Sequence, residues 1–357
     1  MAERHALEGY SRPLGSSKSS DSEKSSIRRS KQSSLLEFYS SPKGNQSQSP
    51  PSHKTPDRFE KIHSTPERLL ARMEWKNKRF ERRPRAMVAK ETLDIIPDVL
   101  SQLPCHPPTG YLHTPPHTRF LDIKYCPNIK GKVRVVEGDT FDTAIQFDQL
   151  FPRKDPKSIR PVCVLNMANA EMPGGGWLNG AMAQEEELCY RSSLSFTLKR
   201  RFYPLGQRDA IYSPNVVIAR KSTKEGYGWL DLAKPDSLPV VSAISMAALE
   251  RPALLQGQNN FEYKNPTDRE MMKEKMRVVL RVAAYNRHRR LVLGAFGCGA
   301  FHNPREEVAK CWAEVLKEKE FQGWWETIAF AIITLPGPSQ QRPSLGIFKE
   351  LLDGLSV

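Results

Sequence analysis

The pattern of hydrophobic and polar positions divides the chain into three stretches. The first 66 residues hold 17 serines and few large apolar side chains. Such a composition buries too little apolar surface to offset the entropy of ordering, so we predict a disordered tail over 1–66. Residues 67–131 mix apolar with basic residues and then with prolines. From residue 132 onward, short apolar runs alternate with amphipathic stretches, which predicts a folded domain over 132–357.

The middle stretch, 67–131, predicts an extension that packs on this domain. Large apolar residues are spread among nine Lys/Arg and three Glu over 67–90. This pattern predicts a basic helix, broken near Pro84 because proline lacks the N–H that a helix needs. A second amphipathic turn is expected over 91–96. The Pro-rich segment 104–131 is expected to form an ordered loop over the core.

Residues 132–357 carry the pattern of an α/β domain. The predicted strands cover 132–136, 161–165, 210–219, 239–246, 291–295 and 327–334. The predicted helices cover 183–200, 267–285 and 304–319, and a further helix begins at Asp139-Thr140. Thr267 or Asp268 is expected to cap the helix over 267–285. Such alternation predicts a mainly parallel or mixed sheet with helices on both faces. Ligands of these folds bind in loops beyond the carboxyl ends of the strands.

Charge and cysteine usage narrow the class of protein. The formal net charge of +14 indicates a polyanionic partner, either nucleic acid or another phosphate-rich polymer. No apolar run approaches the ~20 residues of a membrane span, and the first residues lack the apolar stretch of a secretory signal. The six cysteines form no CxxC pair, which predicts a reducing compartment. The histidines show no metal-ligand spacing, so we expect neither a catalytic metal nor a cofactor.

A glycine-rich loop follows the apolar run at 161–165. It carries Asn169 and then three consecutive glycines, Gly174, Gly175 and Gly176. Three glycines remove every Cβ from a short stretch, so the backbone can press on a ligand. Free N–H groups near a helix start suit a phosphate. The alternative interpretation is a flexible turn.

Acidic residues begin the helix after this loop, at Gln184, Glu185, Glu186 and Glu187. Acidic residues favour the first turn of any helix. A carboxyl held near a diphosphate in partly apolar surroundings also has a raised pKa, which suits a general acid. Neighbouring helical residues point about 100° apart, so adjacent glutamates cannot share one role.

A second glycine-rich loop follows the apolar run at 291–295. Its backbone amides can bind the other side of a diphosphate, and its aromatic residue can stack on a sugar or base. The alternative is a plain strand-to-helix turn with core aromatics. The residues concerned are Gly297, Cys298, Gly299, Ala300 and Phe301. No His with Asn/Asp pattern accompanies Cys298, so we do not expect it to be a nucleophile.

One pattern resembles the signature of poly(ADP-ribose) glycohydrolases: three glycines, then seven residues, then Gln184-Glu185-Glu186. The next stretch, LCYRSSL at 188–194, is similar to the microbial branch of that family. The resemblance covers roughly 85–350. It implies a macrodomain-like three-layer sandwich, with helices on both faces of a mixed, mostly parallel sheet. In macrodomains a turn like Gly138-Asp139-Thr140 contacts adenine, although an N-cap role explains Asp139 equally well.

The resemblance also implies a reaction and roles for individual residues. The enzyme would hydrolyse ribose–ribose O-glycosidic bonds of poly(ADP-ribose), mainly from chain ends, and release ADP-ribose. Glu186 would protonate the leaving 2′-oxygen and then act as base toward water. Glu185 would position the riboses, Asn169 would bind the distal ribose, and Gln184 would orient the two glutamates. The diphosphate, held by both glycine loops, would offset an oxocarbenium-like charge.

Three alternatives stay open at this point. The first is a macrodomain reader that binds ADP-ribose without cleaving it, although a reader does not need the Gln184-Glu185-Glu186 triplet. The second is a hydrolase acting mainly on mono-ADP-ribose. The third is a scaffold or nucleic-acid binder whose basic helix over 67–90 is the active part.

The tail carries a motif of its own at 32–39. Its fixed positions are Gln32, Leu35, Phe38 and Tyr39, which resemble the motif by which disordered tails dock on the DNA sliding clamp (PCNA). A short 3₁₀ turn would place the three apolar side chains together, and the basic residues at 28–31 would steer association. The alternative is a small apolar patch that contacts the folded domain. We expect a monomeric protein that binds the clamp and is nuclear, and an additional cytoplasmic pool stays open.

Overall fold

The computed structural model describes residues 66–115, 118–150, 160–257, 261–334 and 343–357. The chain divides after Ile62, and everything described here belongs to the second unit, His63–Val357. The predicted tail, with its clamp-like motif at 32–39, lies outside the described residues except for Pro66. Among the described residues, no helix combines the length and apolar character that crossing a membrane requires.

A mixed seven-stranded sheet with the order β1-β4-β5-β3-β8-β9-β2 forms the centre of this unit. Its strands are β1 Tyr111–His113, β2 Lys132–Glu137, β3 Cys163–Met167, β4 Ala210–Val217, β5 Val240–Met246, β8 Arg290–Leu293 and β9 Thr327–Ile332. Pairing is parallel from β5 through β3, β8 and β9 to β2, and antiparallel where β1 and β4 form one edge. The central strand is apolar along most of its length because helices cover both of its faces.

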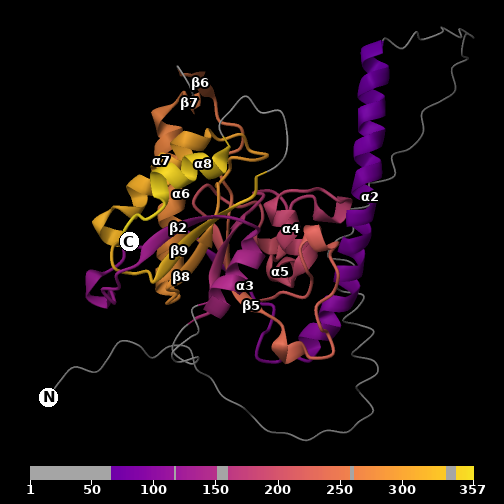
Figure 1. Cartoon of the computed structure of the whole chain (residues 1–357), viewed down its shortest axis with the longest axis horizontal. Coiled ribbons are helices and arrows are strands. Elements are labelled where there is room, and N and C mark those ends of the chain that lie inside the picture. The colour runs from indigo at the N-terminus through magenta and orange to yellow at the C-terminus, as the bar shows by residue number, and fades with distance from the viewer. Residues whose placement is uncertain (1–65, 116–117, 151–159, 258–260, 335–342) are drawn as a thin grey trace, which may run out of the picture. The chain divides into compact units, whose positions relative to one another are not determined.

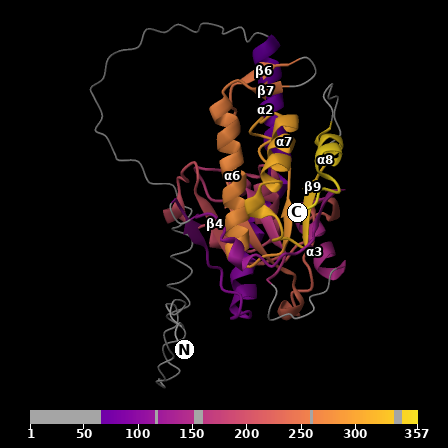
Figure 2. The same ribbon diagram turned by 90° about the vertical axis from the view of Figure 1, so that its left-hand side faces the viewer.

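Helices form a layer on each face of the sheet, because successive side chains of a strand point to opposite faces. Leu165 and Phe330 pack with α6 (Pro266–Tyr285), α7 (Arg305–Leu316) and α8 (Ser344–Leu352). Val164 and Ala329 pack with α3 (Thr140–Leu150), α4 (Gln184–Arg191) and α5 (Leu194–Thr197). Figure 1 shows both layers, and Figure 2 shows the α6, α7 and α8 layer facing the viewer. The predicted three-layer sandwich is confirmed.

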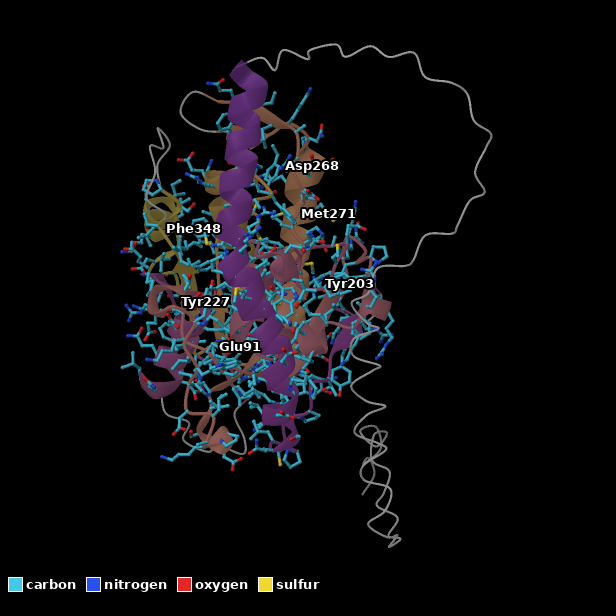
Figure 3. All side chains as sticks on the ribbon, turned by 90° about the vertical axis from the view of Figure 1, so that its right-hand side faces the viewer. Glu91, Tyr203, Tyr227, Asp268, Met271 and Phe348 are labelled. Carbon is cyan, nitrogen blue, oxygen red and sulfur yellow. The ribbon has the colours of Figure 1, made fainter. Side chains whose placement is uncertain are left out.

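The long helix α2 (Pro66–Ser101) lies with its C-terminal part, from Arg82 onward, along the outside of the layer that contains α4 and α5 (Figures 1 and 3). The predicted break near Pro84 is wrong, because the helix continues through that residue. A proline inside a helix costs about 3 kcal/mol. Tertiary contacts offset this cost: Ala89 and Ile96 are buried, and the Thr92 hydroxyl donates a hydrogen bond to the Tyr190 carbonyl at 2.9 Å.

The helix predicted over 183–200 is interrupted, so that α4 and α5 are separate. Ser192 has extended backbone and bridges to Ile218. Its hydroxyl donates to the Leu188 carbonyl at 2.8 Å and accepts from the Leu194 amide at 3.1 Å. These bonds give the backbone an alternative to the helical ladder.

Smaller differences concern element ends and short elements. The cap of α6 is Asn265 rather than Thr267 or Asp268, because Pro266 takes the first helical position. The sequence did not predict β1, α8 or the hairpin of β6 (Leu254–Gln256) and β7 (Phe261–Tyr263). Single 3₁₀ turns complete the described part: η1 Ile123–Tyr125, η2 Trp177–Asn179, η3 Arg200–Phe202, η4 Thr223–Glu225, η5 Pro235–Ser237 and η6 Lys319–Phe321.

Candidate active site

Both glycine-rich loops lie at the edge where the parallel strands end. The first loop leaves β3 after Met167 and the second leaves β8 after Leu293. A Cβ on Gly294 would lie 3.1 Å from the Met167 Cε atom. A Cβ on Gly297 would lie 2.6 Å from the Cβ of Ala248, which follows β5. The structure therefore places these loops side by side at the carboxyl ends of the strands, where α/β folds bind ligands.

Glu185 is buried in the first turn of α4 and lies under the first glycine loop. Its Oε2 accepts a hydrogen bond from the Asn169 amide at 2.7 Å, and its Oε1 accepts one from Asn166 Nδ2 at 3.2 Å. Burial raises the pKa of Glu185 to about 8, and repulsion from Glu186 adds to the effect of burial, while these hydrogen bonds oppose it. At neutral pH this carboxyl is therefore mainly protonated.

Glu186 lies directly beneath the glycine triplet. Its Oε1 accepts a hydrogen bond from the Gly176 amide at 2.9 Å. Gly175 has a φ of +56°, and a Cβ there would lie 2.6 Å from Glu186 Oε1 and 3.2 Å from Glu185 Oε2. Only glycine permits both this backbone conformation and this close approach. In the described part of the chain, no hydrogen bond or ion pair engages the second oxygen of Glu186, so that oxygen is available to a ligand.

Glu187 points away from the other two glutamates. Its Oε2 accepts a hydrogen bond from the Tyr227 hydroxyl at 2.5 Å, and its Oε1 accepts one from the Thr223 amide at 3.1 Å. Burial raises the pKa of Glu187 as well. Tyr227 is labelled in Figure 3 on the side of the domain that α2 covers. As the helical geometry predicts, the three neighbouring carboxyls therefore have three different environments.

Gln184 and Asn169 hold the backbone of the first loop. The Gln184 side chain accepts from the Met167 amide at 2.9 Å and donates to the Leu165 carbonyl at 2.7 Å. These bonds fix the start of α4 against the end of β3. The Asn169 Oδ1 accepts from the Glu171 and Met172 amides at 2.8 and 2.9 Å, which closes an Asx turn before the glycines.

Two residues that the sequence reasoning did not select support this arrangement. Asn166 is fully buried at the end of β3 and also donates to the Ser245 hydroxyl at 2.9 Å. The Tyr190 hydroxyl lies 2.9 Å from the Trp177 carbonyl and 2.7 Å from the Ala181 carbonyl, and so holds the segment between the glycines and α4. A polar residue in the otherwise apolar run of β3 was the signal available for Asn166.

Asp139 is an N-cap in the structure. Its Oδ1 accepts from the Phe141 and Asp142 amides at 2.8 and 3.1 Å, at the start of α3. It also forms an ion pair with the buried Arg191 at the end of α4. The N-cap interpretation is therefore confirmed, while an adenine contact stays a prediction.

Asn303 holds the second glycine loop from below. It donates to the Leu249 carbonyl at 2.7 Å and the Gly297 carbonyl at 3.1 Å, and it accepts from the Tyr263 hydroxyl at 2.9 Å. Phe301 packs partly on the core, whereas Gly299 and Ala300 are exposed at the tip of the loop. Burial raises the pKa of the Cys298 thiol to about 12, which makes it a poor nucleophile.

Comparison with known proteins gives this site its context. The model of the catalytic domain of microbial-type PARG, poly(ADP-ribose) glycohydrolase, matches residues 108–221. The PARG of Thermomonospora curvata is 26% identical over 75% of this chain and 99% of its own, with a TM-score of 0.60. The PARG of Deinococcus radiodurans in complex with ADP-ribose is 30% identical over 68% of this chain and 93% of its own, with a TM-score of 0.54. No curated protein sequence matches the chain.

The α/β fold, the buried carboxyls under a glycine-rich loop and these similarities together define a glycohydrolase. The family is that of the microbial-type poly(ADP-ribose) glycohydrolases, to which this chain belongs. A further solved structure, the T. curvata enzyme bound to the inhibitor ADP-HPD, is 27% identical over 74% of this chain and 98% of its own, with a TM-score of 0.58. Within the described residues, no group of three or more His, Cys, Asp and Glu side chains is placed to hold a metal ion.

Proposed function

We propose that the enzyme removes ADP-ribose units from poly(ADP-ribose), mainly at chain ends, with Glu186 as general acid and base. One observation carries the proposal: Glu186 is buried, with one oxygen fixed by the Gly176 amide and the other unengaged among the described residues. A carboxyl fixed in this way beside a glycine loop can exchange a proton with a sugar oxygen whose diphosphate lies against that loop.

The reaction has two steps that return Glu186 to its starting state. Glu186 first donates its proton to the leaving 2′-oxygen, while the bond from that oxygen to the anomeric carbon breaks. The electron pair leaves with the oxygen, and an oxocarbenium-like centre forms, stabilised by the nearby diphosphate. A water then adds to the anomeric carbon and gives its proton to the Glu186 carboxylate. One glycosidic bond is hydrolysed, and the acid is regenerated.

Glu185 is a positioning residue in this scheme. Because burial raises its pKa to about 8, it is mainly neutral at pH 7 and adds little negative charge near the substrate diphosphate. A protonated carboxyl can also donate a hydrogen bond to a ribose hydroxyl. Its contacts with Asn169 and Asn166 fix its orientation, so Asn169 acts through the loop backbone as well as by its proposed contact with the distal ribose.

A reader without activity is the weaker alternative, as is a hydrolase of mono-ADP-ribose. Burying three carboxyls in one helical turn costs stability, and binding alone does not require that cost. The net charge of +14 suits a polymer with many diphosphates better than a single ADP-ribose.

The tail proposal concerns the partner and the location. The motif at Gln32, Leu35, Phe38 and Tyr39 supports docking on the DNA sliding clamp, hence a nuclear enzyme acting in the DNA damage response. The monomeric state stays a prediction. Replacing Leu35, Phe38 and Tyr39 by alanine in the full chain should abolish clamp binding and leave hydrolysis unchanged. Retained clamp binding would refute this part of the proposal.

The enzymatic proposal is tested by release of free ADP-ribose from purified poly(ADP-ribose) in the presence of EDTA. Wild type should release it, and Glu186→Gln should be slower by about 10²–10⁴ or more because the general acid is lost. Binding of ADP-ribose should be retained in the variant. Tight ADP-ribose binding without release by wild type would indicate a reader instead.

A further inference from the structure

Two exposed basic segments flank the first glycine loop. One is the segment 199–208, where Arg201 and Arg208 are exposed. The other is the part of α2 that contains Arg82 and Arg83, which are also exposed. The two segments are far apart in sequence, and specific contacts hold each of them beside the first glycine loop.

The segment 199–208 is attached to the residues just before the glycine triplet. The Leu205 amide donates to the Ala170 carbonyl at 2.8 Å, and Leu205 is buried. Arg200 NH1 donates to the Glu171 carbonyl at 3.3 Å. Arg201 and Arg208 therefore lie on a segment that is fixed to one end of the site loop.

Helix α2 is attached to the residues just after the triplet. A Cβ on Gly180 would lie 2.0 Å from the Arg82 carbonyl oxygen, so the helix backbone rests directly on this glycine. Arg85 Nε donates to the Gly180 carbonyl at 2.9 Å. Arg82 and Arg83 therefore lie at the other end of the same loop.

These four arginines differ from those of α6. On α6, each arginine is paired with glutamates: Arg269 with Glu307 and Glu314, Arg277 with Glu318, and Arg281 with Glu320. In contrast, no carboxylate among the described residues pairs with Arg82, Arg83, Arg201 or Arg208. Asp209, which follows the segment 199–208, accepts a hydrogen bond from the Gly206 amide at 2.8 Å. A net positive charge at both ends of the site loop results.

We propose that Arg82, Arg83, Arg201 and Arg208 form a cationic rim that binds the poly(ADP-ribose) chain beyond the unit being hydrolysed. This inference rests on the proposed function. Each further unit of the polymer carries a diphosphate, and arginine binds phosphate oxygens with paired donors. The rim makes the enzyme favour long chains over short ones, because the additional contacts lie outside the unit that reacts.

The rim predicts a specific split in kinetic constants. The variant Arg82→Gln/Arg83→Gln/Arg201→Gln/Arg208→Gln should raise KM for long polymer about tenfold or more and leave kcat nearly unchanged. Hydrolysis of an oligomer of two units should change little. The slope of log(kcat/KM) for long polymer against log[salt] should become shallower by about 2–3, since each lost phosphate contact contributes about 0.7.

A matched control removes the same charge from the opposite helical layer and the adjoining β2 edge. The control uses four exposed lysines of this region, namely Lys130, Lys317, Lys319 and Lys349. The variant with glutamine at these positions should keep the wild-type KM and salt slope. Equal effects of both variants, or an equal loss on oligomer and polymer, would overturn the rim. Failure of the wild type to hydrolyse even the oligomer would instead refute the proposed function.

Discussion

The contact between Gly175 and the buried carboxyls predicts a large loss of activity from one added methyl group. In Gly175→Ala the Cβ would lie 2.6 Å from Glu186 Oε1, where ordinary contact begins at 3.4 Å. To reach ordinary contact the carboxyl must move by 3.4 − 2.6 = 0.8 Å, and a shift of that size away from the Gly176 amide stretches their hydrogen bond from 2.9 Å to 2.9 + 0.8 = 3.7 Å. A misplacement of about 1 Å costs about 10²-fold in rate. The φ of +56° adds about 1–2 kcal/mol of backbone strain to the alanine variant.

The assay combines kcat for ADP-ribose release from poly(ADP-ribose) with thermal unfolding of the same samples. We expect kcat of Gly175→Ala to fall about 10²-fold while the protein stays folded, with Tm lowered by a few degrees. The control is Gly354→Ala, since Gly354 has a φ of +81° and nothing within 4 Å of an added Cβ. It carries the same backbone strain without touching the site, and should keep wild-type kcat. A folded Gly175→Ala variant with kcat within threefold of wild type would refute the reasoning.

Three further predictions concern the groups around the site. Glu185 has a folded pKa of about 8 against 4.5 in model compounds, so the native state holds its proton more tightly, and wild-type stability falls as pH rises from about 5 to 8. Glu185→Gln should lose this dependence, so its free energy of unfolding should rise relative to that of wild type by a few kcal/mol between pH 5 and 8. A difference in free energy of unfolding that does not change with pH would contradict the assignment. Cys298→Ala should keep activity within a few fold of wild type. Iodoacetamide at pH 7 should label the exposed Cys105 without inactivating the enzyme. If iodoacetamide inactivated wild type but not Cys298→Ala, the Cys298 thiol would be reactive after all. Tyr190→Phe removes the one hydroxyl proton near the Ala181 and Trp177 carbonyls, and Trp177 keeps the Gly180 amide as a donor. The lost hydrogen bond costs about 1–3 kcal/mol and loosens the segment before α4, so kcat should fall roughly tenfold with little change in KM. An unchanged kcat would assign Tyr190 to packing alone.

The sequence predicted a sheet covered on both faces because apolar strands alternate with amphipathic helices along the chain, and the family resemblance implied the three-layer sandwich. It failed where long-range contacts override local rules. Pro84 does not end α2, because Ala89 and Ile96 anchor the helix on the domain. The break after Arg191 combines local hydrogen bonds of the Ser192 hydroxyl with the bridge between Ser192 and Ile218, and the bridge is a long-range contact that no local pattern contains.

The sequence predicted those parts of the site in which uncommon residue types, such as consecutive glycines or glutamates, stand close together along the chain. The glycine triplet and the glutamates at 185 and 186 do meet in space, as their spacing indicates. Tyr190 resembles an ordinary core residue in sequence, whereas Asn166 stands out as a polar residue in an apolar strand. The hydrogen bonds of the structure connect both residues to the site. For Asp139 the sequence allowed either an adenine contact or a helix N-cap. In the structure Asp139 caps α3 and also forms an ion pair with Arg191.

The central claim is that Glu186, rather than either of its neighbours, transfers the proton. The most direct measurement compares Glu185→Gln, Glu186→Gln and Glu187→Gln with wild type in one assay of ADP-ribose release from poly(ADP-ribose). We predict that Glu186→Gln loses at least 10²-fold in kcat while it still binds ADP-ribose, and that Glu187→Gln, which faces Tyr227, stays within about tenfold of wild type. Near-normal turnover by Glu186→Gln, with a larger loss in either neighbour, would contradict the account.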